Sequence, residues 1–292
     1  MVFLKTLVKV FIDSFNSWLA HRGASKGAAL AFYALFSLAP ILVLTIAVAG
    51  LFFGATAAEG QIIYQIQNLV GLNGAVAIQA ILVAARDPVG GQIATIVAIG
   101  LLLIGATSVF TELKGSLDEL WGVRKSELSP ISILLRTRLL SFGLVLVLTL
   151  LLLISLVVSA LLNLFEQYVG NVMSSSAQLF TTLTSIVSFG VITCLFAVIY
   201  KMLPDEPLSW HDVAIGSMFT ACLFTLGKYL IGLYIGNSAV ASGFGAAGSV
   251  IAILLWVYYS AQIFFLGAEF TRQYSLCFGS LKQYKKQQVE LD

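Results

Sequence analysis

Long apolar segments that are almost free of charge constrain this chain more than any other feature. The most pronounced contains the run LVLVLTLLLLISLVVSALL and extends from about residue 139 to residue 162. A helix of about 20 mainly apolar residues crosses the hydrocarbon core of a bilayer, which is roughly 30 Å thick. Only 10% of the residues are charged, whereas soluble domains have about 25%. The sequence therefore predicts an integral membrane protein.

Six segments are long and apolar enough to cross a membrane. Each must satisfy its own backbone hydrogen bonds in lipid, and none shows the alternation of a barrel strand, so we expect an all-α, polytopic membrane protein. A single transmembrane domain is predicted for residues 1–275, with a polar cytoplasmic tail at 276–292. The expected spans cover about 27–54, 93–111, 139–162, 183–203, 213–235 and 249–270.

The positions of the basic residues predict the orientation of these spans. Cytoplasmic connections retain Lys and Arg. Nearly all of the 16 basic residues lie before the first span, after the last, or at the connections that follow the second and fourth spans. Arg86 and Lys228 are the exceptions. Both termini are therefore predicted to be cytoplasmic.

Residues 1–22 are predicted to form an amphipathic helix rather than a cleaved signal. Lys5, Lys9 and Asp13 are each four residues apart and form a polar stripe along a helix. The opposite face is apolar, and such a helix lies in the membrane interface. Its apolar residues are Phe3, Leu4, Leu7, Val8, Phe11, Phe15 and Trp18.

The outer connection between the first two spans, residues 55–92, is unusually apolar for a segment in water. QIIYQIQNLV and AVAIQAILVAA both have helical periodicity, and Gly71, Asn73 and Gly74 separate them. We expect a helical hairpin at the outer face. It acts either as a lid packed on the end of the bundle or as a gate over a cavity.

Polar residues inside spans require an explanation because they are costly in lipid. Lys228 is predicted in the outer half of the fifth span, where it either snorkels to the interface or contacts an anionic substrate or headgroup. Gln262 is expected to form a hydrogen bond to a neighbouring helix. Glu269 is expected to pair with Arg272 at i,i+3. Together with Glu112 and Lys114, these two residues are predicted to form an inner polar cluster.

Breaks in membrane helices expose backbone groups and supply hinges. Pro40 lies inside the first span and lacks a backbone donor, so it is a candidate kink. Pro204 follows the fourth span, and Gly245 and Gly248 lie in the glycine-rich turn before the sixth. We interpret these positions as candidate hinges, with close helix packing as the simpler explanation for the glycines.

The sequence offers little support for catalysis. The chain has two histidines and no clustered ligand run for a metal hydrolase. Asp205, Glu206, His211 and Asp212 lie close together, but they fit a helix-capping loop better than a metal site. The isolated cysteines form no ligand motif, and there is no phosphate-binding loop or RNA-binding groove. We therefore expect no cofactor, no metal, no catalytic residue and no nucleic acid partner.

Three segments carry a resemblance to a known family. They are SKGAALAFYALFSLAPILV from Ser25, YKMLPDEPLSWHDVAIGS from Tyr200, and GFGAAGSVIAILLWVYYSAQIFFLGAEFTR from Gly243. Over nearly its whole length the chain resembles the YihY/BrkB inner-membrane family of bacteria. This resemblance implies the topology and an inner-membrane location. The family's former label, ribonuclease BN, is regarded as mistaken, and its members have been linked to transport or envelope phenotypes.

Two classes of function remain open from the sequence. The first is a translocator of an amphiphile, lipid or small anionic solute, not ATP-driven by itself, with Lys228 near its pathway. The alternative is a non-transporting scaffold or regulator of envelope assembly. An enzyme is disfavoured because no nucleophile, base and orienting group can be assembled at one depth. The expected partners are membrane lipids, the transported molecule and further copies of the chain.

Overall fold

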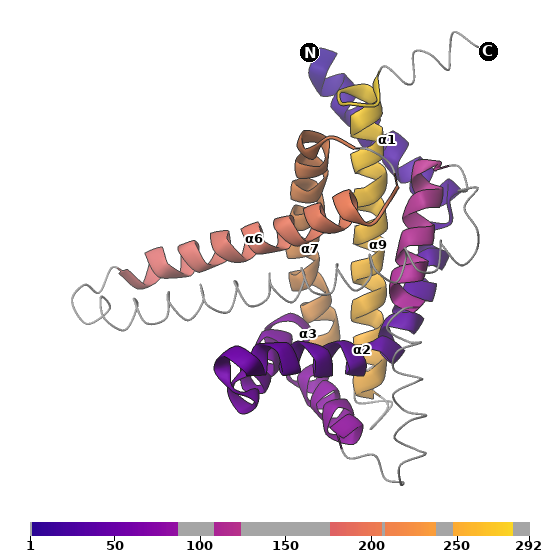
Figure 1. Cartoon of the computed structure of the whole chain (residues 1–292). Helices are drawn as coiled ribbons and strands as arrows, with labels where there is room; N and C mark the ends of the chain where they lie inside the picture. Colours follow the sequence, from indigo (N-terminus) through magenta and orange to yellow (C-terminus); the bar gives the residue numbers. More distant parts are fainter. Residues whose placement is uncertain (1, 87–107, 124–175, 206–207, 238–247, 283–292) are drawn as a thin grey trace.

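The computed structural model describes residues 2–86, 108–123, 176–205, 208–237 and 248–282. All regular structure in these ranges is α-helical, which confirms the predicted all-α class for this part of the chain (Figure 1). A helix without a label in Figure 1 covers 108–121 and is named by that range. The labelled helices are α1 (Val2–Ala20), α2 (Gly23–Phe53), α3 (Ala55–Arg86), α6 (Ser176–Met202), α7 (Trp210–Asn237) and α9 (Gly248–Cys277).

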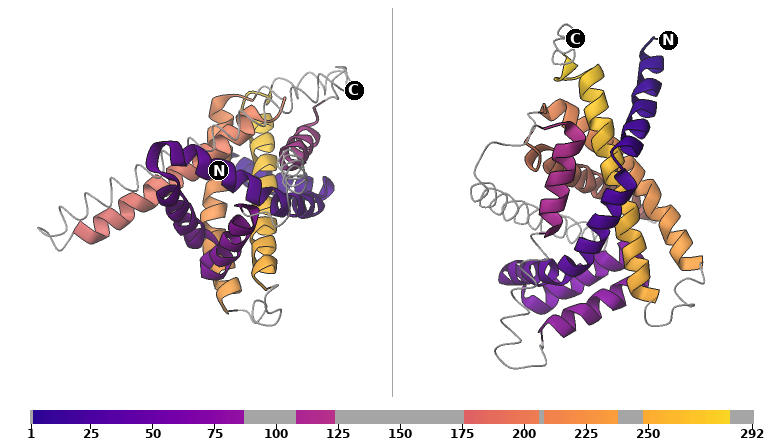
Figure 2. Two further views of the ribbon diagram at one scale, coloured as in Figure 1. Left: turned by 60° about the horizontal axis from the view of Figure 1, so that its bottom comes forward. Right: turned by 90° about the vertical axis from the view of Figure 1, so that its right-hand side faces the viewer.

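Helix α9 is the centre of the described structure. Helices α1, α2, α3 and α7 all pack against it, and α6 packs on α7. Figures 1 and 2 show α6 leading away from the α7 and α9 pair, so most of its surface is exposed. Contacts to α9 therefore hold segments together that are far apart in the sequence.

Two glycine and threonine pairs bring α7 and α9 into close contact. A side chain at Gly216 would collide with Thr271, and a side chain at Gly267 would collide with Thr220. Each threonine hydroxyl donates to the carbonyl of the glycine four residues earlier, at 2.8 Å on α7 and 2.7 Å on α9. The two helices thus present the same Gly-x-x-x-Thr pattern to one another. Small residues of this kind let helix backbones approach closely.

Two polar anchors attach other helices to the backbone of α9. The hydroxyl of the buried Tyr200 on α6 donates to the Phe264 carbonyl at 2.7 Å. The indole N–H of Trp121, which ends the 108–121 helix, donates to the Ala268 carbonyl at 3.1 Å. Both aromatic rings also belong to the main apolar core. Large apolar area and a satisfied polar tip therefore act together at each anchor.

Helix α1 and the start of α2 run antiparallel to α9 along a contact that we call the seam. Figure 2 shows indigo α1 descending beside the C-terminal part of α9. Three residue pairs define the seam: Ser17 with Gln273, His21 with Glu269, and Ala24 with Gln262. Residue numbers increase along α1 and the start of α2 while those of their partners on α9 decrease, as expected for antiparallel segments. The seam brings the N-terminal segment onto the last helix, which sequence distance alone does not indicate.

The predicted outer hairpin is wrong. Residues 55–86 form the single helix α3, and the chain reverses earlier, at Gly54, whose φ is 82°. This positive φ suits a residue without a Cβ. Gly71 and Gly74 each weaken a helix by only about 1 kcal/mol relative to Ala. Burial of the apolar face of α3 against α2 and α9, centred on Ile78 and Leu82, outweighs that loss.

The N-terminal helix is confirmed as a helix, and part of its predicted apolar face packs inside the protein: Phe11 contacts Phe219 and Phe270, and Trp18 packs against the main core. Val10 and Ser14 are buried, whereas Val8, Phe11 and Phe15 of the predicted face are about half exposed. The buried face follows the seam against α9. The exposed apolar stripe is therefore free to meet lipid, and the location of α1 in the interface stays a prediction.

Three of the described helices are long and apolar enough to cross a membrane. They contain Thr182–Met202, Trp210–Ile231 and Val250–Cys277, which match the fourth, fifth and sixth predicted spans. Helix α2 covers the first predicted span. The third span and nearly all of the second lie outside the described residues. The count of six spans therefore stays a prediction.

The candidate hinge positions fall at different kinds of place. Helix α2 is helical on both sides of Pro40, α6 ends two residues before Pro204, and Gly248 is the first residue of α9. Gly245 lies outside the described residues. Hinge motion at any of them stays a prediction.

The close contact of α7 with α9 predicts a specific sensitivity to side-chain size. Gly267→Val should lower the free energy of unfolding by roughly 1–3 kcal/mol, because the added carbons collide with Thr220 and overpack the contact. Gly190→Val on α6 is the matched control, since a Cβ there meets open space. Thermal unfolding in detergent measures both variants. Equal stability of the two would contradict the packing described for α7 and α9.

Candidate functional site

A fully buried carboxylate on α9 is the starting point of the candidate site. The Glu269 side chain has no exposed surface and lies within the apolar stretch Val250–Cys277. An ionised carboxylate is costly to remove from water unless it is paired and hydrogen-bonded. The residues around Glu269 therefore decide whether this position is tolerable.

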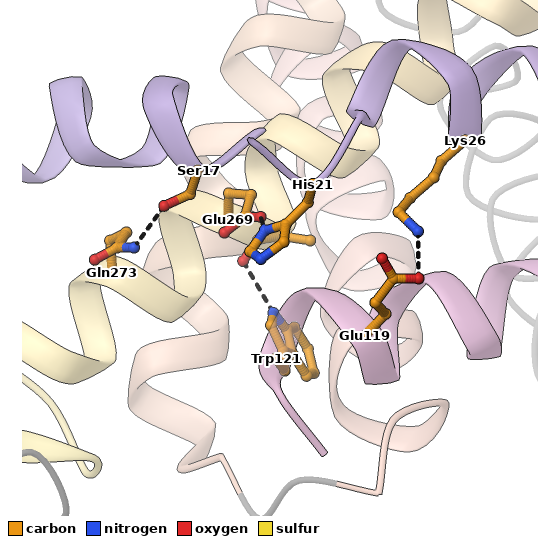
Figure 3. A network of polar contacts seen from close by, with 8 residues as sticks. Ser17, His21, Lys26, Glu119, Trp121, Glu269 and Gln273 are labelled. Atoms are coloured by element: carbon orange, nitrogen blue, oxygen red, sulfur yellow. Dashed lines mark hydrogen bonds and ion pairs between the residues drawn. The ribbon is translucent and has the colours of Figure 1, made fainter. Parts of the chain in front are cut away.

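His21 supplies the partner. Its Nδ1 lies 2.5 Å from Glu269 Oε1, and Figure 3 shows the two side chains next to each other. His21 sits in the turn between α1 and α2, where Arg22 adopts a left-handed conformation with φ of 54°. Positive φ is uncommon outside glycine, and here it marks the corner that points His21 at α9. In the described part of the chain, the other carboxylate oxygen, Oε2, is buried and has no hydrogen-bond partner.

A cleft of about 500 Å³ adjoins His21, which is part of its lining. The His21 side chain is 30% exposed, whereas the carboxylate that it contacts is fully buried. Lys26 and Glu119 form an ion pair of 2.6 Å at the cleft, which links α2 to the 108–121 helix (Figure 3). The cleft is lined by Ala20, His21, Arg22, Ser25, Lys26, Ala29, Glu112 and Glu119.

The predicted inner polar cluster is divided between separate contacts. Glu269 contacts His21, and Glu112 lines the cleft. Arg272 reaches toward the turn at Gly122 after the 108–121 helix. Lys114 belongs to a different group of charges. The four residues thus lie around one end of the described bundle. Glu269 contacts His21 rather than Arg272, and Lys114 pairs with Asp118 and Asp205.

Lys114 forms the second group of charges. Its amine donates to Asp118 and to Asp205, both at 2.8 Å. Asp118 also accepts the backbone N–H of Asp205 at 3.1 Å. Lys114 is buried, so this network fixes the segment after α6 to the 108–121 helix. Its role is structural, because every charge in it has an opposite partner.

Asp212 at the start of α7 has a structural role as well. Its buried carboxylate accepts the backbone N–H and the hydroxyl of Ser280, at 2.8 and 2.7 Å. These bonds attach the start of α7 to the turn after α9. Among the described residues there is no group of three His, Cys, Asp or Glu placed to hold a metal ion. Glu206, one of the ligand-type residues near this point, lies outside those residues.

The two pathway candidates lie in different surroundings. Gln262 donates from Nε2 to the Ala24 carbonyl at 3.3 Å, so it links α9 to α2 as expected of a polar residue in a bundle. Its Oε1 is buried without a partner in the described part. Lys228 is half-buried on α7, and its amine lies 5.5 Å from the centroid of the Tyr229 ring. Lys228 is not among the residues that line the cleft.

His21 and Glu119 are the site residues that sequence reasoning missed. One signal was available for His21. A buried glutamate in an apolar helix needs a partner, and a histidine lies in the AHRG segment between two helical patterns. Nothing in the sequence indicates that this segment folds back onto α9.

These helices and their polar contacts define a polytopic α-helical membrane protein. The chain belongs to the family described as virulence factor BrkB, whose model matches residues 14–291. This match confirms the family resemblance seen in the sequence.

Individual relatives are distant and mostly longer than this chain. A UPF0761 membrane protein of Azotobacter vinelandii is 27% identical over 89% of this chain and 63% of its own length. One from Rhodospirillum centenum is 26% identical over 86% of this chain and 54% of its own. The ribonuclease-like protein YfkH of Bacillus subtilis is 24% identical over 92% of this chain and 94% of its own. The chain thus spans 54–64% of the length of the first UPF0761 relatives. No solved structure matches with significance.

The Lys114 network predicts a charge-specific loss of stability. Lys114→Met should lower the free energy of unfolding by roughly 2–3 kcal/mol, because Asp118 and Asp205 then lose the cation that they share. Adding Asp205→Asn should recover part of this loss. Lys9→Met, at an exposed position of α1, is the control. Thermal unfolding in detergent tests the series, and wild-type stability of Lys114→Met would contradict the network.

Proposed function

We propose that the protein is a translocator of an amphiphile, a lipid or a small anionic solute in the bacterial inner membrane, and that it does not hydrolyse ATP itself. One observation carries this proposal. The cleft at the corner of α1 and α2 adjoins the contact between His21 and the buried Glu269, which lies on a helix of membrane-spanning length. Ionisable groups inside membrane segments mark substrate and ion pathways by default.

The surface next to the cleft favours an amphiphile among these substrates. Ala29 lines the cleft, and Phe32 and Phe36 follow it at helical spacing on α2. Both phenylalanines are more than half exposed, and their ring centroids are 4.9 Å apart. A polar cleft thus continues into an exposed aromatic stripe. This arrangement suits a molecule with an anionic headgroup for Arg22 and Lys26 and an apolar chain for the stripe.

The proposed orientation follows from the basic residues. With both termini cytoplasmic, the cleft opens near the cytoplasmic surface, since Arg22 and Lys26 belong to the basic region before the first span. Lys228, which we predicted near the pathway, then belongs to the opposite part of the membrane. A role for Lys228 in substrate passage remains part of the proposal.

The second candidate function is a non-transporting scaffold or regulator of envelope assembly. The close α7 and α9 packing and the saturated Lys114 and Asp212 contacts favour it, because they resemble a rigid structural unit. A scaffold requires partners, including further copies of this chain, but no flux. We place an enzyme third, since the described residues assemble no nucleophile with a base and an orienting group.

A flux assay in reconstituted vesicles separates the first two functions. Arg22→Gly combined with Lys26→Ala should abolish movement of a fluorescent anionic phospholipid between leaflets, because the headgroup loses both cations. Glycine at position 22 retains the left-handed turn, which protects the fold. Leu51→Ser, at an exposed position on α2 remote from the cleft lining, is the control.

The outcomes of this assay are distinct. Protein-dependent flux that survives Leu51→Ser and is lost in the double variant supports translocation through the cleft. Wild-type protein without flux of any lipid or anionic solute in a broad panel would contradict translocation and favour the scaffold.

A further inference from the structure

We propose that His21 and Glu269 form a proton-binding site, in which the imidazole passes a proton between the cleft and the buried carboxylate. This inference rests on the proposed function and deepens it, because protonation of the pair would gate translocation. It rests on the arrangement of three features: the cleft, the half-buried imidazole and the fully buried carboxylate.

The position of His21, which lines the cleft and also contacts the buried carboxylate, is the first argument. His21 lines the cleft, whereas Glu269 does not. The carboxylate has no exposed surface, and its Oε1 is 2.5 Å from the imidazole Nδ1. A proton from the cleft therefore reaches this carboxylate most directly through the ring. Histidine suits the task because its two nitrogens can accept a proton on one side and donate one on the other.

The transfer conserves atoms and charge. A proton from water in the cleft binds Nε2 of the neutral ring, whose Nδ1–H donates to Glu269 Oε1. The Nδ1 proton then moves to Oε1, which leaves a neutral ring protonated at Nε2 and a neutral carboxylic acid. The N–H bond at Nδ1 breaks as the O–H bond forms. Release of the proton to the cleft follows the same steps in reverse.

The unsatisfied oxygen of Glu269 is the second argument. Oε2 is buried without a partner in the described residues, so the ionised carboxylate has only one strong hydrogen bond there. A merely structural ion pair favours full satisfaction of both oxygens. Two further polar atoms of the seam helices, Trp18 Nε1 and Gln262 Oε1, are also buried and unsatisfied. The seam thus contains buried polar atoms that lack hydrogen-bond partners, whereas the amine of Lys114 is paired with two carboxylates.

Other charges face this pair from each side of the cleft. The corner of α1 and α2 contributes Arg22 and Lys26, and the 108–121 helix contributes Glu112 and Glu119. Arg272 lies one turn further along α9. On α7, the nearest buried charge is Asp212, which is already bound to Ser280. The rim of the cleft thus carries charges of both signs, whereas Glu269 is the carboxylate that lies buried behind it.

Infrared difference spectroscopy of the full chain in lipid nanodiscs tests the proposal without any solute. Acidification of the wild type should produce the C=O stretching band of a buried carboxylic acid, and Glu269→Gln should abolish it. His21→Gln should retain the band at a shifted frequency, because an amide replaces the imidazole donor, and the band should appear more slowly after a jump to low pH, because an amide cannot relay a proton. Asp13→Asn on α1 is the carboxylate control. Gln273→Ala is the seam control, because it breaks the bond to Ser17 but removes no titratable group.

The outcomes separate this proposal from the proposed function. A band lost only in Glu269→Gln and shifted only in His21→Gln supports the proton site, even if vesicles show no lipid or solute flux. In that case the proposed translocation is contradicted, whereas the proposed proton-binding site is supported. A wild type without the band, or a band that persists in Glu269→Gln, overturns the proton site and leaves translocation to its own assay. If Glu269→Gln does not fold, an unshifted band in His21→Gln overturns the proposal equally.

Discussion

A carboxylate inside an apolar helix must find compensation within the protein, and much of the described structure follows from how Glu269 finds it. The low dielectric of a helix bundle makes an unpaired charge very unfavourable. His21 provides the counter-group only because the chain turns at Arg22 and the α1 to α2 corner lies against α9. The same corner forms the cleft. One electrostatic requirement therefore links the N-terminal segment, the last helix and the candidate site.

Helix packing supplies the other half of this account. Apolar side chains gain little from contact with one another in lipid, so close backbone approach and hydrogen bonds hold membrane helices together. The Gly-x-x-x-Thr pairs place α7 against one side of α9, and the Tyr200 and Trp121 donors attach two more segments to its carbonyls. Helix α9 is thereby fixed on several sides, which holds Glu269 at a defined depth and orientation.

The sequence predicted local features well and tertiary contacts poorly. Apolar length correctly located α2, α6, α7 and α9, because the constraint imposed by a bilayer acts within each segment. The outer hairpin failed because Gly71 and Gly74 were interpreted as a turn, although packing of α3 overrides two weak helix positions. Glu269 was correctly selected as a polar residue that needs a partner. Its partner was missed because i,i+3 spacing to Arg272 is visible in a sequence, whereas a contact to His21 across 248 positions is not.

The register of α1 against α9 is the central claim, since the ion pair and the cleft both depend on it. Cysteine cross-linking in native membranes measures it most directly. In a background without the native cysteines, Ser17→Cys with Gln273→Cys should be joined rapidly by a short bifunctional thiol reagent, because Gln273 Nε2 donates to Ser17 Oγ at 3.0 Å and the reagent spans the length that the glutamine loses. Ser17→Cys with Gly190→Cys, whose second position is on α6, should remain unlinked. Equal cross-linking of both pairs, or none in either, would contradict the seam and the site built on it.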